Sequence, residues 1–233
     1  MLLVACMADV SFLFAGSRFQ PLPCGALYWP EQGALLVADL HLEKGSAFAR
    51  RGWLLPPYDS LDTLNRLAAA VSATGAVRLF ALGDSFHDSR GPARLGDAAR
   101  ERLRTIMQMC EIVWITGNHD GDSGALLGGM AIAELEVAGI LLRHEAGRQE
   151  VRPEISGHFH PKVTLALRTG RRVTRRCIAT TDRKLVLPAY GAYAGGLDVG
   201  DPAFRAALGT APDALLPVAG NLLRVAARQE RFA

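Results

Sequence analysis

Three short apolar segments alternate with two stretches of helical periodicity in the first half of the chain, and this alternation restricts the possible folds most strongly. The apolar segments are 34–38, 77–82 and 111–116, and the helical stretches cover 58–74 and about 97–109. Short apolar runs separated by amphipathic helices are typical of parallel strands joined by helical connections. The sequence therefore predicts an α/β fold, with further short strands at 10–15 and 26–29 in front of this unit.

The expected helix over 58–74 has clear signals at its start. Pro56 and Pro57 precede it, and Asp59 and Ser60 are residue types that commonly cap the first turn of a helix. We therefore expect Asp59 or Ser60 to accept hydrogen bonds from the backbone of this helix.

Strands dominate after residue 130. We expect them over 133–137, 140–143, 163–168, 173–181 and 184–187, with Ile155 in a further strand before Gly157. A run of strands without intervening helices favours a second, largely antiparallel sheet. Two sheets packed face to face, with helices outside, would bring the loops after the strands to one rim. The segment from about Asp201, rich in Ala, Leu and Arg, indicates no function.

The composition is that of an ordinary folded protein. Of the 233 residues, 49% are hydrophobic and 21% are charged, so we expect a single domain over 1–233. No apolar segment is long enough to span a bilayer, and 1–6 lacks the basic leader of a lipoprotein signal, so no membrane association is expected. The cysteines form no CxxC pair, which argues against a zinc knuckle or a disulfide framework and favours a cytoplasmic protein; they are Cys6, Cys24, Cys110 and Cys177.

The charge permits a nucleic-acid partner without requiring one. The net charge is only +3, but all except three of the 26 basic residues are arginines, whose planar guanidinium binds phosphate in a bidentate manner. A high GC content of the coding DNA would produce the same bias.

All six histidines lie in or beside five polar clusters, most of which follow an expected strand. The clusters are Asp39-x-His41, Gly83-Asp84-Ser85-Phe86-His87-Asp88, Gly117-Asn118-His119-Asp120, His144 and Gly157-His158-x-His160. Imidazole nitrogen combined with carboxylate and amide oxygen suits Mn, Fe or Zn better than Ca. His144 alone would be equally compatible with a buried structural histidine. The ordered set predicts a site for two divalent metal ions.

The series DxH, GD, GNHD, His and GHxH, in this order over 39–160, resembles the calcineurin-like metallophosphoesterase superfamily. This resemblance implies a four-layer α/β/β/α sandwich, in agreement with the strands and helices expected above, and a metal-dependent phosphoesterase. It also implies the metal ligands: Asp39, His41 and His160 for one ion, Asn118, His144 and His158 for the other, and Asp84 as the bridge between them.

The same resemblance assigns catalytic roles to two further residues. Water between the two ions would lose a proton near neutral pH and attack phosphorus in line. His119 directly follows the ligand Asn118, so it is expected to protonate or stabilise the leaving oxygen. Asp120 would orient His119; alternatively, it is an acid that forms the turn after the strand.

Three phrases look more specifically like the bacterial DNA-ligase-associated metallophosphoesterases, namely VADLHLEKG at 37–45, LGDSFHD at 82–88 and LPAYGAY at 187–193. This similarity implies a manganese-dependent phosphodiesterase and DNA endonuclease that acts on single-stranded DNA in repair, in functional association with a DNA ligase and a helicase. Gly-Asp-x-Phe-His is also similar to nucleases that repair double-strand breaks, in which this histidine lies near the scissile phosphate. His87 is therefore a further catalytic candidate; alternatively, it holds a metal ligand in place.

Two basic clusters are candidates for substrate binding. Arg50 and Arg51 follow the DxH loop, and Arg171 and Arg172 follow the turn of a hairpin expected after His160. Both clusters could grip a phosphate backbone. Alternatively, the charged hairpin is only a solvated edge that prevents aggregation. The loop aromatic residues that could stack on bases are Trp53, Tyr58, Tyr190 and Tyr193.

Two other functions remain open. A phosphatase or phosphodiesterase for small nucleotides would use the same metals in a narrower, capped site, although no insertion large enough for a cap is visible. A catalytically silent scaffold would have lost ligands, whereas here the full set is present. Sequence leaves undecided the metal, with Mn expected before Fe or Zn, and also endo or exo action, strand preference and oligomeric state.

Overall fold

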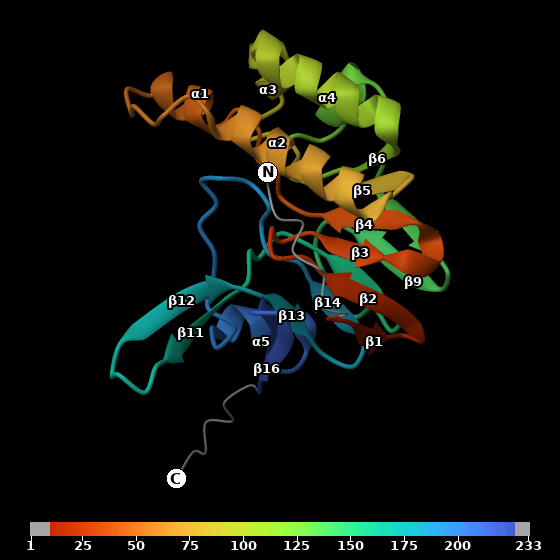
Figure 1. The fold of residues 1–233 in the computed structure, drawn as a ribbon, viewed down its shortest axis with the longest axis vertical. Helices are drawn as coiled ribbons and strands as arrows, with labels where there is room; N and C mark the ends of the chain where they lie inside the picture. The colour runs from red at the N-terminus through yellow and green to blue at the C-terminus, as the bar shows by residue number, and fades with distance from the viewer. Residues whose placement is uncertain (1–9, 227–233) are drawn as a thin grey trace.

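A computed structural model describes residues 10–226, which form two seven-stranded sheets and a separate hairpin (Figure 1). The first sheet has its strands in sequence order: β1 (Phe12–Phe14), β2 (Ser17–Pro21), β3 (Leu27–Trp29), β4 (Ala34–Val37), β5 (Arg78–Leu82), β6 (Glu111–Ile115) and β7 (Met130–Ile132). Neighbours from β1 to β4 are antiparallel, and neighbours from β4 to β7 are parallel. The expected parallel unit is thus extended at one edge by an antiparallel meander.

The second sheet has the order β16-β15-β13-β14-β10-β9-β8. Its strands are β8 (Glu134–Val137), β9 (Ile140–Arg143), β10 (Glu154–Ser156), β13 (Ile178–Thr180), β14 (Lys184–Val186), β15 (Asp213–Val218) and β16 (Asn221–Val225). Most neighbours are antiparallel, as expected, but β10 is parallel to both β9 and β14. The sheet is therefore mixed.

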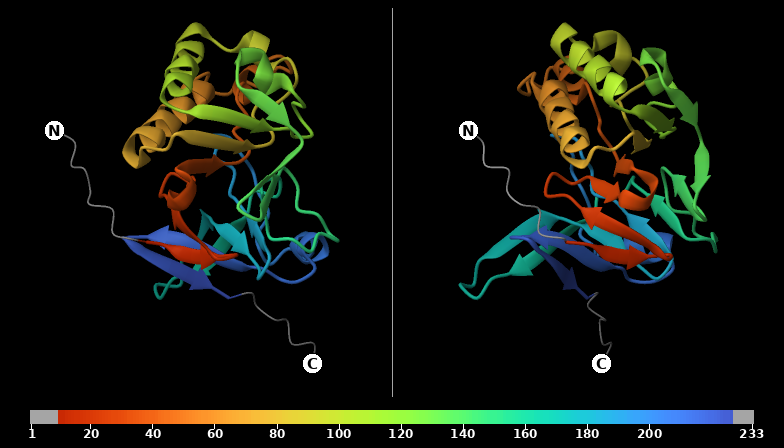
Figure 2. Two further views of the ribbon diagram at one scale, coloured as in Figure 1. Left: turned by 90° about the vertical axis from the view of Figure 1, so that its right-hand side faces the viewer. Right: turned by 45° about the vertical axis from the view of Figure 1, so that its right-hand side comes forward.

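Helices cover the outer face of the first sheet. The two long ones are α2 (Asp59–Thr74) and α4 (Asp97–Met109), accompanied by the short α1 (Lys44–Ala49) and α3 (Gly91–Arg94) and by two 3-10 turns at Pro30–Gln32 and Ser123–Leu127. Only α5 (Pro202–Leu208) packs on the outer face of the second sheet within the described residues. The two views of Figure 2 show α2 and α4 above the first sheet and the second sheet below it.

Three apolar clusters hold these layers together. Leu64 and Leu67 of α2 pack on one face of the first sheet, Trp29 and Ile155 belong to a cluster between the two sheets, and Phe204 of α5 packs on the outer face of the second. Burial of such side chains stabilises each by roughly 1.5–3 kcal/mol. The expected four-layer sandwich is confirmed, with a thin outer layer on the second sheet.

The start of α2 differs from the expectation. Asp59 and Ser60 do not cap the helix, since its N-cap residue is Tyr58 and no side chain bonds there. Asp59 instead accepts a hydrogen bond from the Gly45 backbone N–H at 2.8 Å. Ser60 Oγ accepts from the Glu43 N–H and donates to its carboxylate, both at 2.8 Å. Both side chains therefore brace the loop that follows His41.

The expected strand over 173–181 is two strands. Its first half is β12 (Arg172–Arg176), which pairs with β11 (Lys162–Ala166) in the separate hairpin; its second half is β13 in the second sheet. The break falls at Cys177, which is buried, and Cys24, Cys110 and Cys177 form no disulfide. Cys6 and the rest of 1–6 lie outside the described residues. Within 10–226, no helix combines the length and the apolar character needed to cross a membrane.

Candidate metal centre

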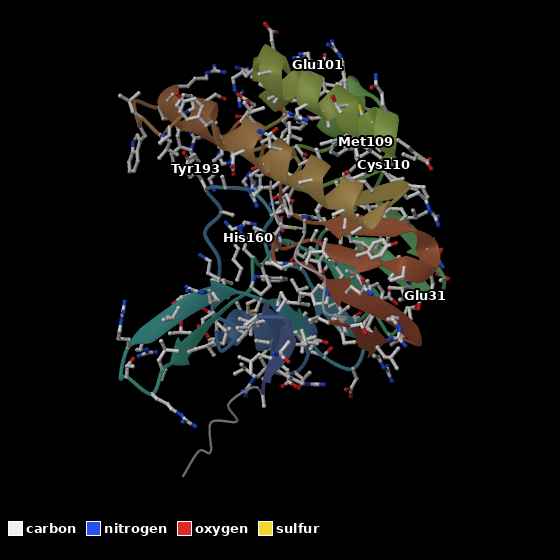
Figure 3. The ribbon with its side chains drawn as sticks, in the orientation of Figure 1. Glu31, Glu101, Met109, Cys110, His160 and Tyr193 are labelled. Carbon is white, nitrogen blue, oxygen red and sulfur yellow. The ribbon has the colours of Figure 1, made fainter. Side chains whose placement is uncertain are left out.

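The expected metal ligands and catalytic residues all lie in loops after the carboxyl ends of five strands. Asp39 and His41 follow β4, Asp84 and His87 follow β5, and the GNHD segment follows β6. His144 follows β9 of the second sheet, and the segment from His158 to His160 follows β10. A parallel bridge between Ala38 and Ala189 joins the two sheets at this point. In Figure 3, His160 lies on the side of the molecule between the helical layer and the β11–β12 hairpin.

Asp39, His41 and His160 form the first of three groups whose ligand atoms lie close enough to hold one metal ion. The two ring nitrogens His41 Nε2 and His160 Nε2 are 3.2 Å apart, and His160 Nε2 is 3.5 Å from Asp39 Oδ1. This convergence of nitrogen lone pairs on a carboxylate is the arrangement that a divalent cation would occupy.

Asp39 and Asp84 form a second such group with His144. Asp84 Oδ2 is 3.5 Å from His144 Nε2, which is in turn 2.9 Å from the side-chain amide of Asn118 and 3.2 Å from His158 Nδ1. The six ligands and the bridge implied by the resemblance thus lie close together. Asp84 lies beside His144 and belongs to the same group as Asp39.

The buried carboxylates fit a bound cation. Asp39 is fully buried; its Oδ2 accepts a hydrogen bond from the His158 N–H at 2.9 Å, but its Oδ1 has no hydrogen-bond partner within 10–226. Asp84 Oδ1 accepts from the His119 N–H at 3.0 Å. A buried carboxylate oxygen without a partner is costly, and a metal ion would compensate it. The donor set and this orphaned oxygen together fit a divalent metal.

Backbone strain is concentrated at the same place. Within 10–226, nine residues other than glycine have positive φ, and six of them are in these loops. They are Asp39, His41, Glu43, Asp84, His158 and His160, with φ between 43° and 73°. Each such residue costs on the order of 1–3 kcal/mol, which the packing of the fold must offset. Strained backbone that recurs at five of the expected ligands supports a functional site.

Two glycines permit the close approach of the ligand loops. A Cβ atom at Gly83 would overlap the His144 ring, and a Cβ atom at Gly117 would overlap the backbone and carboxylate of Asp84. The glycines of the GD and GNHD motifs are therefore required by the spacing of the ligands around them.

Burial keeps the imidazole of His41 neutral. Burial, with the neighbouring His160 and Lys44 as further causes, lowers the pKa of His41 to about 2. Burial also lowers the pKa of His87, and the positive charge of Lys44 adds to this effect. A neutral imidazole has a free lone pair, which is the form that binds metal.

The neighbours of His119 differ from the expectation. Within 10–226, Asp120 forms no hydrogen bond or ion pair with the His119 ring; its buried Oδ2 accepts a hydrogen bond from the Phe86 N–H at 2.9 Å. Burial raises the pKa of Asp120 to about 6. The His119 ring instead has its Nδ1 3.1 Å from the backbone carbonyl of His87, and its Nε2 is 3.8 Å from Asp84 Oδ2. Asp120 therefore holds the loop after β5, and His87 orients His119 through its carbonyl.

His87 lies beside the first metal group. Its ring centroid is 5.9 Å from that of His41 and 5.5 Å from that of His119, and these three histidines form the third group that could hold a cation. The position is compatible with either expected role, contact with substrate or support of a ligand.

The basic candidates occupy two different places. Arg50 and Arg51 are exposed at the end of α1 and line a cavity of about 390 Å³ together with Asp88 and Ser89. Arg171 and Arg172 are exposed at the far end of the hairpin, which projects from the body in Figure 1, and no hydrogen bond or ion pair of the described chain joins them to the metal centre. The structure thus brings only the first pair near the site.

Sequence patterns did not indicate Glu43 as a site residue. Its side chain is buried against Ser60, and its own φ of 64° reverses the chain between His41 and α1. The sequence offered one signal, because Glu43 follows the ligand His41 by two residues in the phrase DLHLEKG. An acidic residue just before a helix is too common, however, to identify a site residue.

The four-layer sandwich and the histidines and aspartates gathered at its strand ends agree with the fold and site expected of a metallophosphoesterase. The solved structure of Pseudomonas putida nuclease MPE is similar to this chain, with a TM-score of 0.71 and 29% sequence identity over 92% of this chain and 98% of that one. A phosphoesterase from E. coli, YfcE, matches with a TM-score of 0.41 and 17% identity over 70% of this chain and 83% of that one. No protein-family model and no curated protein sequence matches the chain. The protein is thus a metal-dependent phosphoesterase, similar in fold and in site residues to that nuclease.

Proposed function

We propose that the protein is a phosphodiesterase and DNA endonuclease with two metal ions, most suitably manganese. The observation that carries the proposal is that two ligand groups meet at Asp39, one with His41 and His160 and the other with Asp84 and His144. The exposed His119 ring lies beside Asp84. The similarity to a nuclease over nearly the whole chain supports the same substrate class.

The ligands would divide as the family resemblance implies. Asp39, His41 and His160 would hold one ion, Asn118, His144 and His158 the other, and Asp84 would contribute to both. Ions bound there would supply Lewis-acid polarisation of the phosphate and activation of water near neutral pH.

The chain itself would handle the proton of the leaving group. The His87 carbonyl accepts a hydrogen bond from the protonated His119 Nδ1, which fixes the orientation of the ring. The His119 side chain is 41% exposed and its Nε2 faces the centre, so Nε2–H is placed to donate to a departing alkoxide. Asp120 would act by holding the loop that carries His87.

The exposure of the centre favours a polymeric substrate over a small nucleotide. His119 is exposed, and His158 and His160 are only partly buried. A strand could therefore cross the centre without entering a closed pocket. We further propose that the substrate is single-stranded DNA, and that the protein acts in the cytoplasm in DNA repair with a ligase and a helicase; the three phrases at 37–45, 82–88 and 187–193 support this setting.

A side-by-side assay tests the proposal. A phosphomonoester, an aryl phosphodiester and circular single-stranded DNA are incubated with protein and manganese, with chelated samples as controls. Cleavage of the circle together with the diester supports an endonuclease. Hydrolysis of the monoester or of nucleotides with an intact circle would instead support the small-nucleotide function, and no metal-dependent hydrolysis would contradict both.

A further inference from the structure

An exposed aromatic segment lies between α1 and α2. Trp53 and Tyr58 are each 68% exposed and Leu54 is 89% exposed, although large apolar side chains normally lie inside. We name residues 50–58 the lip. An exposed cluster of this kind, next to a functional site, indicates a binding surface.

The lip is fixed at both ends. At its start, the Trp53 N–H donates to the Phe48 carbonyl at 3.1 Å, and the two rings meet edge to face with centroids 6.3 Å apart. At its end, the Tyr193 hydroxyl donates to the Pro56 carbonyl at 3.0 Å. Figure 3 shows Tyr193 just below α1, on the same side as His160. The backbone that carries Trp53 is therefore anchored before any ligand binds, which reduces the entropy cost of binding.

A series of rings connects the lip to the metal centre. The Phe48 ring is 5.6 Å from the His87 ring, and His87 is 5.5 Å from His119, between centroids. Trp53 thus lies two ring contacts away from the histidine beside the candidate leaving-group residue. This short path is compatible with one strand that contacts both places.

Positive charge accompanies the aromatic rings. Lys44 Nζ lies 5.9 Å from the Phe48 ring centroid, and Arg50 and Arg51 line the cavity of about 390 Å³ beside α1. The one carboxylate lining this cavity, Asp88, is engaged by Arg94 through two hydrogen bonds of 2.9 Å. The arginines of the lip therefore face no competing acid within the described cavity. Stacking rings beside a basic groove are typical of sites for single strands.

We propose that the lip binds the unpaired bases of a single-stranded polynucleotide, with a base stacked on Trp53 and adjacent phosphates on Arg50 and Arg51. The inference rests on the proposed function and names the surface that would select the single-stranded form. A duplex would keep its bases paired and stacked, so it would offer nothing to Trp53. Basic side chains favour the polynucleotide over an apolar protein partner.

Intrinsic fluorescence provides a direct test. Trp29 and Trp114 are buried, so quenching by an added ligand reports on Trp53. With metal chelated so that the strand stays intact, a thymidine oligonucleotide is expected to quench the fluorescence, whereas a blunt duplex and an abasic strand of equal phosphate number are not. The Trp53→Phe variant should lose the signal but keep most of the affinity.

Kinetics separate stacking from a structural role. Trp53→Ala should raise KM for single-stranded DNA between about 5-fold and about 150-fold, the range for loss of one base stack, with kcat nearly unchanged. Leu54→Ala is the matched control, because the Leu54 side chain is also exposed but has no aromatic ring. This variant should behave as wild type. Hydrolysis of an aryl diester should be unchanged in both variants, which also shows that they fold.

The outcomes distinguish the two proposals. If wild type hydrolyses neither diester nor DNA, the proposed function fails. If wild type cleaves single-stranded DNA but Trp53 shows no quenching and Trp53→Ala has a normal KM, the lip proposal alone is overturned, and the lip is then a surface for another partner. Equal quenching by the abasic strand would likewise overturn base stacking.

Discussion

At the residue scale, Asp84 is the carboxylate expected to join the two metal ions. It is buried, accepts a backbone hydrogen bond from His119 and lies 3.5 Å from His144 Nε2. We expect Asp84→Ala to abolish hydrolysis and to lower the metal content, because one carboxylate would be removed from both ions. Metal analysis and a diester assay check this. His41→Ala, which removes a terminal ligand, should regain part of its activity in excess manganese.

His119 has a different expected effect. Because it acts on the leaving oxygen, His119→Asn should retain metal, lose roughly two to four orders of magnitude on DNA and lose much less on an aryl diester with a good leaving group. Parallel rates on the two substrates measure this difference. An equal loss on both would exclude the leaving-group role, and loss of metal would make His119 a ligand.

The ligand clusters could be predicted from sequence because each consists of residues adjacent in the chain at a strand end. The role of Asp120 could not. Adjacency to His119 suggested a contact, but successive residues after a strand point in different directions, and Asp120 faces Phe86. The partner of His119 is a backbone carbonyl, which has no sequence signature.

At the element scale, the arginines of the β11–β12 hairpin differ in their contacts. The Arg171 and Arg172 side chains are exposed at its end, whereas Arg176 Nη2 donates to the Gly191 carbonyl at 2.9 Å, in the segment that borders Asp39. Changing Arg171 and Arg172 to Ser should weaken binding of long strands. It should also reduce the slope of log affinity against log salt concentration by about 0.7 for each phosphate that is no longer neutralised. Titrations at several salt concentrations measure the slope.

A matched change in the same hairpin provides the control. Arg176→Ser should lower diester hydrolysis, because it releases the segment beside the first ligand, while the Arg171 and Arg172 variant leaves it intact. Unchanged DNA affinity and salt slope for the latter would show that the hairpin end is only a solvated edge.

Elements with strong periodicity could be predicted closely. The structure has α4 and β9 at the expected residues, and α2 begins one residue later. The short α1 was missed, because it is entered through Glu43 at positive φ and contains Gly45, so it lacks the usual start signals. Likewise β15 contains Pro217, which weakens its strand pattern.

At the scale of the whole molecule, the candidate centre joins the two sheets. Asp39, His41, Asp84 and Asn118 come from the first sheet, and His144, His158 and His160 come from the second. Ions bound there would connect the layers, and their loss would leave buried charge without compensation. Sequence order could predict the meeting of the strand ends and the hairpin after His160, but not the thin outer layer or that this hairpin stands apart from the second sheet. The expectation of one domain over 1–233 stays a prediction.

Metal should therefore stabilise the fold. At manganese about 100 times its dissociation constant, binding adds about 2.7 kcal/mol, which corresponds to roughly 5–11 °C in Tm for a chain of this size. Thermal melts with manganese and with chelator measure the difference. In Asp84→Ala, manganese should raise Tm only slightly. An equal rise in Tm in that variant would place the bound metal elsewhere.

The positive φ angles of the ligand loops have a consequence for the evolution of the protein. Among residues other than glycine, Asp, Asn and His tolerate the left-handed region best, and the five strained ligands are all Asp or His. Backbone shape and metal chemistry thus select the same few residue types. Selection on the fold and selection on the metal site therefore act together at these positions, because a residue other than Asp, Asn, His or Gly would strain the loop as well as remove a ligand.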